Sequence, residues 1–390
     1  MNQPTLTSEP TRWVTRDVRW ILISQLTFGF AWSLYLLTPK FLATQLHAGP
    51  EIIGQIGAVG GMTGLLIVPF AGYALDRIGR RVFYQLGASL VVLMSIGYLY
   101  VDAIGPLVYV LQGCTSAAFV LAYNASAALL SDYAPPAKLG QAIGWVGGAN
   151  VFMHAIATMV AEPLANEHGW SAVFILGIVS GSGAFLLSFA MRESPARPAA
   201  SASAGSAPAT GPRPTLIAIL ITALLMGSVF TAVFGFVQPY ALREGATEVR
   251  GFFIGFTISA VGCRLLLGGL GDRRGRRLVS VWMLVGYAVS AFLMRLLDPD
   301  LLLVYGLVFG AAHGILYPTL NALVLEVLPG ARRGLGMVLY NGAFNVGSSA
   351  GSLGWGLLAK YHGYPRIYDV AGATALAAAL VLLVGKRSTN

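Results

Sequence analysis

Polar and ionisable side chains that could bind a small solute lie within long apolar stretches of this chain. His313, Tyr317 and Asn321 follow one another at four-residue intervals, so a helix would present all three on one face. Histidine exchanges a proton near neutral pH, and an ionisable group inside an apolar span is costly, which makes it a functional candidate. This stripe could bind a solute or carry a proton. A neutral histidine that bonds to a backbone carbonyl is the alternative.

A second stripe has the same spacing in an earlier apolar stretch. Asn150, His154 and Thr158 would share one helix face, and Glu162 continues that face toward the expected end of the helix. His154 is therefore a second candidate for carrying a proton. We expect Glu162 to be a solvated acid at the helix end rather than a carboxylate that couples transport.

Arg264 is a third ionisable residue within an apolar stretch. Its guanidinium group is always charged, and its planar fork matches a carboxylate or a phosphate. The residue could therefore hold the anionic group of a substrate. It could equally serve as an internal structural tether, and the sequence leaves both interpretations open.

The elements that would position these side chains are membrane-spanning helices. Hydrophobic residues make up 56% of the chain and charged residues 11%, whereas soluble domains carry about 25% charged residues. A spanning helix needs about 20 mostly apolar residues. This composition excludes a water-soluble fold and predicts an all-α membrane protein. Twelve spans are predicted, at residues 20–42, 52–75, 82–101, 105–130, 139–163, 171–191, 215–240, 251–271, 278–297, 301–328, 334–359 and 365–385.

The net charge of +9 is distributed unevenly along the chain. With the N-terminus on the inner side, most of the 25 Lys and Arg residues fall in inner loops, which is the usual bias of membrane proteins. We therefore expect both termini in the cytoplasm and no nucleic-acid partner. Cys114 and Cys263 lie within predicted spans and indicate no disulfide and no metal site. The first 19 residues show no removable signal peptide.

The loop after the second predicted span is repeated after the eighth. Residues 72–81 recur as residues 268–277, with glycine, aspartate and arginine at matching positions. Because six spans return the chain to the side where it started, two such halves have parallel topology and are related by an axis along the membrane normal. The repeat predicts an arm at 1–19, a six-helix bundle at 20–191, a flexible cytoplasmic linker at 192–214, a second six-helix bundle at 215–385 and a tail at 386–390.

These two loop motifs resemble the signature of the major facilitator superfamily, and the resemblance extends over nearly the whole chain. It implies that the loop aspartate caps a neighbouring helix and that the next arginine meets an acid at the end of the fourth or tenth span. The pairs would be Arg77 with Asp132 and Arg273 with Glu326, and they would close a cytoplasmic gate. The gate residues implied by the resemblance are Gly72, Asp76, Arg77, Gly79, Arg80, Asp132, Gly268, Asp272, Arg273, Gly275, Arg276 and Glu326.

In that family spans one, four, seven and ten line a central cavity, so the resemblance places the stripe at His313 against the substrate. Other expected cavity residues are aromatic or carry amides, which suits an amphiphilic or aromatic solute. They are Gln25, Trp32, Tyr35, Gln112, Tyr123, Asn124, Phe234, Gln238, Tyr340, Asn341 and Asn345. The signature of proton-coupled drug antiporters is absent, because Tyr109 stands in place of their arginine and Ala157-Thr158 in place of their Gly-Pro pair.

The chain carries no sequence motif for a metal cluster, a nucleophile elbow or a phosphate-cradling loop, so neither an enzyme nor an ATP-driven pump is predicted. We predict a monomeric secondary transporter of the bacterial inner membrane that needs no cofactor. Its partners would be the lipid bilayer, a small-molecule substrate, and protons or another coupling ion. Proton-linked efflux of an amphiphilic or aromatic compound is the first hypothesis. Proton-coupled uptake of an organic anion is the second, and a membrane receptor or scaffold is the alternative of another class.

Overall fold

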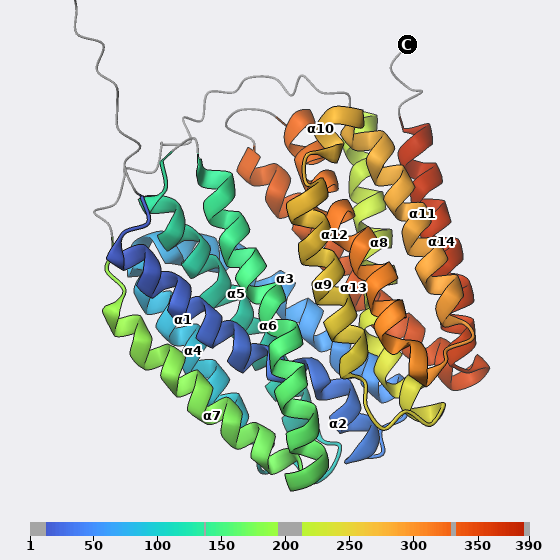
Figure 1. Ribbon diagram of the computed structural model, residues 1–390, viewed down its shortest axis with the longest axis horizontal. Helices are drawn as coiled ribbons and strands as arrows, with labels where there is room; N and C mark the ends of the chain where they lie inside the picture. The colour runs from blue at the N-terminus through green and yellow to red at the C-terminus, as the bar shows by residue number, and fades with distance from the viewer. Residues whose placement is uncertain (1–12, 136–137, 194–212, 329–332, 386–390) are drawn as a thin grey trace, which may run out of the picture.

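The computed structural model describes residues 13–135, 138–193, 213–328 and 333–385, apart from the side chains of 69–76, 139–140, 213–214 and 333–334. Within these ranges the chain is helical (Figure 1). The first half comprises α1 (Arg16–Ser33), η1 (Leu34–Leu37), α2 (Thr38–Thr44), α3 (Pro50–Ile78), α4 (Arg80–Tyr98), α5 (Pro106–Tyr133), α6 (Leu139–His168), α7 (Trp170–Leu187) and η3 (Ser188–Ala190). The second half comprises α8 (Arg213–Arg243), α9 (Arg250–Leu267), α10 (Leu270–Arg274), α11 (Arg276–Met294), η4 (Pro299–Leu301), α12 (Leu302–Val327), α13 (Arg333–His362) and α14 (Tyr364–Val384).

The two halves form two helical bundles that lie side by side (Figure 1). Equivalent helices make equivalent contacts in each bundle. In the first, α4 packs on α5 and α7, and α1 packs on α6 and α7. In the second, α11 packs on α12 and α14, and α8 packs on α13 and α14. The predicted all-α fold of two related bundles is therefore confirmed.

Most of the predicted spans form helices that are long and apolar enough to cross a membrane. Eleven helices of the described chain meet both conditions, and the first of them runs without a break from Arg16 to Thr44. The remaining predicted span, the eleventh at residues 334–359, forms α13, which has 30 residues but is not among the eleven helices. Its many glycine, serine and asparagine residues lower its hydropathy. We attribute this composition to close packing against other helices rather than to exposure to lipid.

Two repeated glycines explain why the loop motif recurs. Gly79 ends α3 with a φ of 106°, and Gly275 ends α10 with a φ of 88°. Residues with a side chain rarely adopt this backbone conformation, so glycine is needed at both turns. Each turn starts the next helix with an arginine, Arg80 in the first half and Arg276 in the second. The repeated sequence therefore encodes a repeated reversal of the chain.

The bundle has two ends, which we name by the chain segments found there. The terminal face carries the start of α1, the start of α8 and the ends of α7 and α14, and the far face carries the end of α2 and the start of α9. On the far-face side, α3 and α13 pack tightly across the two halves. Ser352 Oγ donates to the carbonyl of Gly54 at 2.9 Å, and a side-chain carbon at Gly356 would lie 2.6 Å from the Pro50 carbonyl oxygen. Only small residues permit this approach.

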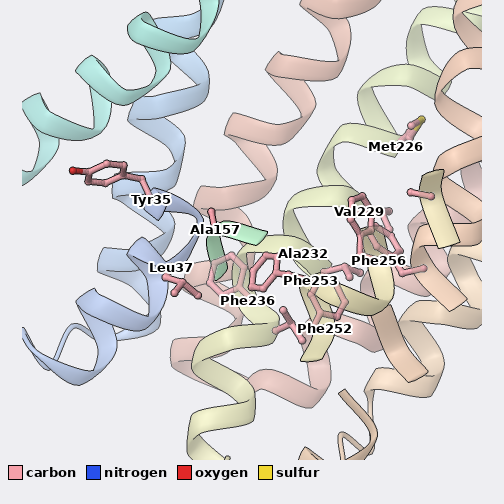
Figure 2. Close-up of a cluster of buried hydrophobic side chains, with 14 of the residues drawn as sticks. Tyr35, Leu37, Ala157, Met226, Val229, Ala232, Phe236, Phe252, Phe253 and Phe256 are labelled. Atoms are coloured by element: carbon pink, nitrogen blue, oxygen red, sulfur yellow. The ribbon is translucent and has the colours of Figure 1, made fainter. Parts of the chain in front are cut away.

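Apolar side chains also close the seam between the halves near the far face. Figure 2 shows Leu37 and Ala157 of the first half beside the aromatic cluster of α8 and α9, which includes Phe236 and Phe253. All four side chains are buried. The contacts of α2 with α8 and of α6 with α9 therefore exclude water from this part of the seam.

Candidate functional site

Aromatic and histidine side chains from both halves meet at the centre of the seam. Trp32 of α1 lies 6.0 Å from the His154 ring of α6, and His154 lies 6.4 Å from Phe234 of α8, measured between ring centroids. The Trp32 indole donates to the Thr115 carbonyl at 3.0 Å, which fixes its orientation. The structure thus brings together two expected cavity residues, Trp32 and Phe234, and the proton-carrier candidate His154, from three helices far apart in the chain.

His313 of α12 lies in an aromatic cluster of the second half. Its Nδ1 atom contacts the hydroxyl of Tyr287, a buried residue of α11 that the sequence did not single out. Its ring centroid lies 4.9 Å from that of Phe230 and 5.7 Å from that of Tyr317. The partner of His313 is therefore a tyrosine hydroxyl, and not the backbone carbonyl considered as the structural alternative.

Tyr317, the next residue of this stripe, bonds to α13. The Tyr317 hydroxyl donates to Asn341 Oδ1 at 2.8 Å, and the Tyr340 hydroxyl donates to the Tyr317 carbonyl at 3.2 Å. Asn321 and Asn345 are both half-buried on the same two helices. These bonds hold α12 and α13 together directly below the histidine, so the stripe has a structural as well as a candidate binding role.

Arg264 of α9 lies close to these groups and to the first half. Its Nε atom donates to the Gly314 carbonyl at 3.4 Å, a long bond. The guanidinium is close enough to interact electrostatically with the hydroxyl groups of Tyr123 of α5, Tyr287 and Tyr317. It is also close enough to interact electrostatically with the rings of His154 and His313. Among the described residues no carboxylate forms an ion pair with this guanidinium, so none of them compensates its charge.

Several buried polar atoms of the expected cavity residues also have no hydrogen-bond partner in the described chain. Such atoms cost about 1–3 kcal/mol each when they stay unpaired, so they are natural points of contact for a ligand. They are Gln25 Nε2 and Oε1, Gln112 Oε1, Asn150 Oδ1, His154 Nδ1 and Gln238 Oε1. The other end of one amide is paired across the seam, since Gln238 Nε2 donates to the Leu36 carbonyl at 2.8 Å.

A cavity of about 210 Å³ opens beside this cluster, and both halves contribute to its wall. The wall is mainly aromatic and aliphatic, with a few hydroxyl and amide groups. It is formed by Trp32, Tyr35, Leu36, Thr38, Pro39, Leu42, Ile53, Ile56, Gly57, Gln112, Thr115, Ser116, Phe230, Thr231, Phe234 and Gly235. Four of the expected residues are therefore on its wall: Trp32, Tyr35, Gln112 and Phe234.

Two of the expected residues have their polar groups turned elsewhere. The Tyr35 hydroxyl bonds to Ser95 of α4 at 2.5 Å, so only its ring faces the cavity. Asn124 is exposed, and its amide donates to the Val120 carbonyl of its own helix at 2.8 Å. Asn124 therefore does not join the cluster, because it lies on a different face of α5 from Gln112.

The loop motifs form ion pairs on the terminal face, but with a different arginine from the one expected. Arg80 pairs with Asp132, and Arg276 Nη1 lies 2.8 Å from Glu326 Oε1. The expected pairs were Arg77 with Asp132 and Arg273 with Glu326. In the second half the turn at Gly275 makes Arg276 the first residue of α11, which packs on α12 and so reaches Glu326.

The capping role expected of the loop acid also differs. In the second copy Asp272 Oδ1 accepts hydrogen bonds from Arg276 Nε and Nη2 at 3.0 and 2.8 Å, whereas α11 has no side-chain cap. Asp272 thus binds the arginine and does not cap the helix backbone. In the first copy the structure does not describe the side chain of Asp76 or the surroundings of Gly72.

Glu162 is not the solvated acid that we expected. It is fully buried, and its Oε1 atom lies 2.5 Å from Lys40 Nζ. Its carboxylate also accepts the backbone N–H groups of Val249 and Arg250 at the start of α9, both at 2.7 Å. Lys40 in turn donates to the Thr247 carbonyl at 2.9 Å. We call these five residues the far-face gate, since they join the two halves there.

The sequence held only a weak signal for the far-face gate. Lys40 and Glu162 carry opposite charges near the same end of two spans, but 122 residues separate them. Lys40 and Glu162 both belong to the first half, and their bonds to Thr247, Val249 and Arg250 reach the second half. An ion pair that does join the two halves lies nearby, with Lys360 Nζ 3.0 Å from Glu51 Oε1. One ion pair and the bonds of Glu162 and Lys40 to residues 247–250 therefore join the two halves at the far face.

Comparison with known proteins bears on what such an arrangement does. A family model described as Major Facilitator Superfamily matches residues 21–263 and 248–390. The cis,cis-muconate transport protein of Acinetobacter baylyi is 23% identical over 338 residues, which cover 81% of this chain and 79% of that protein. A multi-drug resistance efflux pump PmrA homolog of Lactococcus lactis is 25% identical over 384 residues, 90% of this chain and 91% of that protein.

Solved structures show the same fold. The inward open conformation of the xylose transporter XylE from E. coli superposes with a TM-score of 0.75 at 16% sequence identity. The match covers 94% of each chain. At this identity the likeness establishes the arrangement of the helices and leaves the substrate to be argued from the site.

Proposed function

This chain belongs to the Major Facilitator Superfamily and is a transporter rather than an enzyme, and from that premise we propose that it carries a small organic anion. The anion would bind between the two halves, with its charged group at Arg264. The single observation that carries this proposal is the uncompensated guanidinium at the seam.

The cost of an unpaired charge supports an anionic substrate. Placing a charged residue at the centre of a membrane costs about 2.5–3.5 kcal/mol on insertion scales. Arg264 is half-buried in the last turn of α9, so it bears part of this cost. In the described chain Arg264 has one long hydrogen bond and no ion pair to offset this cost. A carboxylate can bond to a guanidinium at two points, so a bound anion would supply the missing charge.

The cavity wall supports an apolar or conjugated body for this anion. Trp32, Phe230 and Phe234 line the cavity, and the first and last of these also border His154. Flat apolar walls hold a flat solute by burying its surface. One relative is described as a transport protein for cis,cis-muconate, a flat dicarboxylate, which agrees with this substrate class.

The contacts that join the two halves lie on one face, and this position supports transport by alternating access. The far-face gate and the pair of Glu51 with Lys360 link the halves on one side. On the terminal face Arg80 and Arg276 form ion pairs within their own halves. We propose that the far face is closed in this state and that the terminal face, with its basic loops, is the cytoplasmic side of a bacterial inner membrane.

Proton coupling is supported by two histidines within electrostatic range of Arg264. A protonated histidine beside an uncompensated arginine puts two like charges in a medium of low dielectric constant. An anion bound between them would offset that repulsion, so the proton and the anion favour each other. This reasoning favours proton-coupled uptake, with His313 as the first candidate for the proton.

Transport by the purified protein in liposomes tests the proposal. We expect uptake of cis,cis-muconate or of small aromatic carboxylates to depend on an inward proton gradient. The substitution Arg264→Gln should weaken binding by about ten- to a hundredfold, because a bond to a charged group contributes about 1.5–3 kcal/mol. Arg243→Gln, which changes an exposed arginine at the far face, is the matched control. Wild-type transport by the Arg264 variant would refute the proposal.

Proton-linked efflux of an amphiphilic or aromatic compound is the second candidate function. The observation that favours it is the aromatic wall of the cavity, which would hold a neutral or cationic solute equally well. The two candidates differ in their need for Arg264. Efflux of a fluorescent aromatic amine that continues in the Arg264→Gln variant would favour this second function.

A further inference from the structure

A second and larger cavity lies outside the path between the two halves. It has a volume of about 820 Å³ and opens at the terminal face of the second half. The helices around it are α10, α11, α12 and α14, and Figure 1 shows α10 at one end of that bundle, with α11 and α14 side by side next to it. Its wall is formed by Gly271, Asp272, Arg274, Gly275, Arg276, Arg277, Leu278, Val281, Leu323, Glu326 and Leu383. The proposed transport function uses none of this space.

The charged part of the wall is basic on balance. Arg276 is held by Asp272 and Glu326, which offset its charge. Arg277 donates through Nη2 to the Leu382 carbonyl, and its buried Nε atom has no partner in the described chain. Arg274 is exposed and forms no ion pair with the described residues. Two of the three guanidinium groups are therefore open to an anion.

The remaining wall is apolar and lies at the edge of the membrane. Leu278, Val281, Leu323 and Leu383 contribute this surface. Leu278 and Leu383 are 50% and 48% exposed, which is expected for side chains that face lipid tails. The apolar spans of α11 and α14 begin at Arg276 and end at Val384, so the cavity lies where the headgroup layer meets the hydrocarbon.

We propose that this cavity binds an anionic phospholipid of the cytoplasmic leaflet. Arg274 and Arg277 would hold its phosphate, and the four apolar residues would hold the start of its acyl chains. Basic pockets between helix ends on the cytoplasmic side suit anionic headgroups, and guanidinium groups pair with phosphate at two points. A soluble phosphate would leave the apolar wall uncovered, which is why we favour a lipid.

This site has a consequence for the gate on the same face. Arg276 lines the cavity and at the same time bonds to Asp272 and Glu326. A lipid phosphate in the cavity competes with these two acids for Arg276. The lipid composition of the inner leaflet therefore modulates how firmly α10 is held to α12.

Lipid binding to the full chain tests this proposal without any transport assay. The purified protein is placed in phosphatidylcholine nanodiscs, and its affinity for added phosphatidylglycerol is measured by native mass spectrometry after release. The double substitution Arg274→Gln with Arg277→Gln should lower that affinity about thirtyfold, because each basic residue near an anionic surface contributes about fivefold. Arg243→Gln at the far face should leave it unchanged.

Three results would overturn the proposal. They are equal retention of phosphatidylglycerol by the double variant and the control, equal retention of phosphatidylcholine and phosphatidylglycerol by the wild type, and displacement of the lipid by millimolar inorganic phosphate. The thermal midpoint in phosphatidylcholine alone shows whether the double variant is folded. If it is not, the single substitution of exposed Arg274 replaces it, with an expected loss of about fivefold.

Discussion

The far-face gate offers the sharpest perturbation, because one carboxylate of the first half accepts two backbone hydrogen bonds from the second half and pairs with a buried lysine. In the closed state Glu162 contacts Lys40 and the N–H groups of Val249 and Arg250. Glutamine at this position keeps the size of the side chain but leaves one acceptor oxygen, and its amide group faces donors. Removing one partner of a buried ion pair costs about 3–5 kcal/mol.

Only the closed state pays this cost, since opening the far face brings both Glu162 and Lys40 into water. The substitution Glu162→Gln should therefore shift the equilibrium toward the open far face by at least about a hundredfold, because 1.4 kcal/mol corresponds to a factor of ten. The attraction within a buried ion pair does little more than offset the desolvation of its two charges. The shift toward the open state therefore comes from leaving the charge of Lys40 buried without a partner. The exchange of both charges should not repair the gate, because a lysine at position 162 cannot accept the α9 N–H groups.

The assay is the rate at which a membrane-impermeant maleimide labels a cysteine in the central cavity from the far side. The reporter is Thr231→Cys, on the cavity wall, in a background where Cys114 and Cys263 are replaced by alanine. We expect Glu162→Gln to raise the labelling rate at least about tenfold. Glu244→Gln changes an exposed acid at the same face and serves as the control. An unchanged rate in the Glu162 variant would refute the gate.

Three further predictions follow from the same structure. Arg264→Lys should keep the charge but lose the two-point geometry, so the affinity for a carboxylate in equilibrium dialysis should fall about tenfold, and an unaltered affinity would argue for a tether. His313→Gln should abolish the dependence of transport on a pH gradient while the protein stays folded, since glutamine can still bond to Tyr287; intact coupling would reject His313 as the proton carrier. Gly356→Val should hinder closure of the far face by clashing with the Pro50 carbonyl, and slower transport with faster maleimide labelling would be the readout.

The sequence could predict the helices and one face of the site. Apolar length alone located the spans, because a membrane leaves the backbone few other solutions. The four-residue spacing of His313 and Tyr317 correctly put both on one side of α12, where their rings lie 5.7 Å apart. The recurrence of residues 72–81 as 268–277 indicated two related halves, and the structure shows the same turn in both copies, where Gly79 and Gly275 have a positive φ.

Contacts between distant helices were beyond reach of the sequence. Glu162 looked like a solvated helix end because nothing local to it indicates Lys40 or the start of α9, which only the meeting of the two halves supplies. The partner of Glu326 was wrong for a similar reason. Arg276 and Arg273 are both near the loop, and only the direction of the chain after Gly275 decides which one reaches the acid.

The polar groups around the cavity show the same limit of prediction from the sequence. The spacing of residues on α5 could not show that Asn124 bonds to its own helix while Gln112 reaches the cavity. The contact of Tyr287 with His313 could not be predicted either. No local sequence pattern distinguishes a tyrosine that bonds to a histidine from one that only packs in an apolar span. The sequence located each helix along the chain, but it did not show which way the side chains point about the helix axis.

The central claim is that Arg264 recognises the negative charge of the substrate, and ligand-induced stabilisation of the purified protein tests it most directly. Thermal midpoints are measured with small aromatic and unsaturated carboxylates and with their neutral amides. At a hundredfold excess over the dissociation constant a bound carboxylate should stabilise the wild type by about 2.7 kcal/mol, whereas the amides and the Arg264→Gln variant should show no shift. Equal stabilisation by acids and amides, or by a carboxylate in both proteins, would contradict the account.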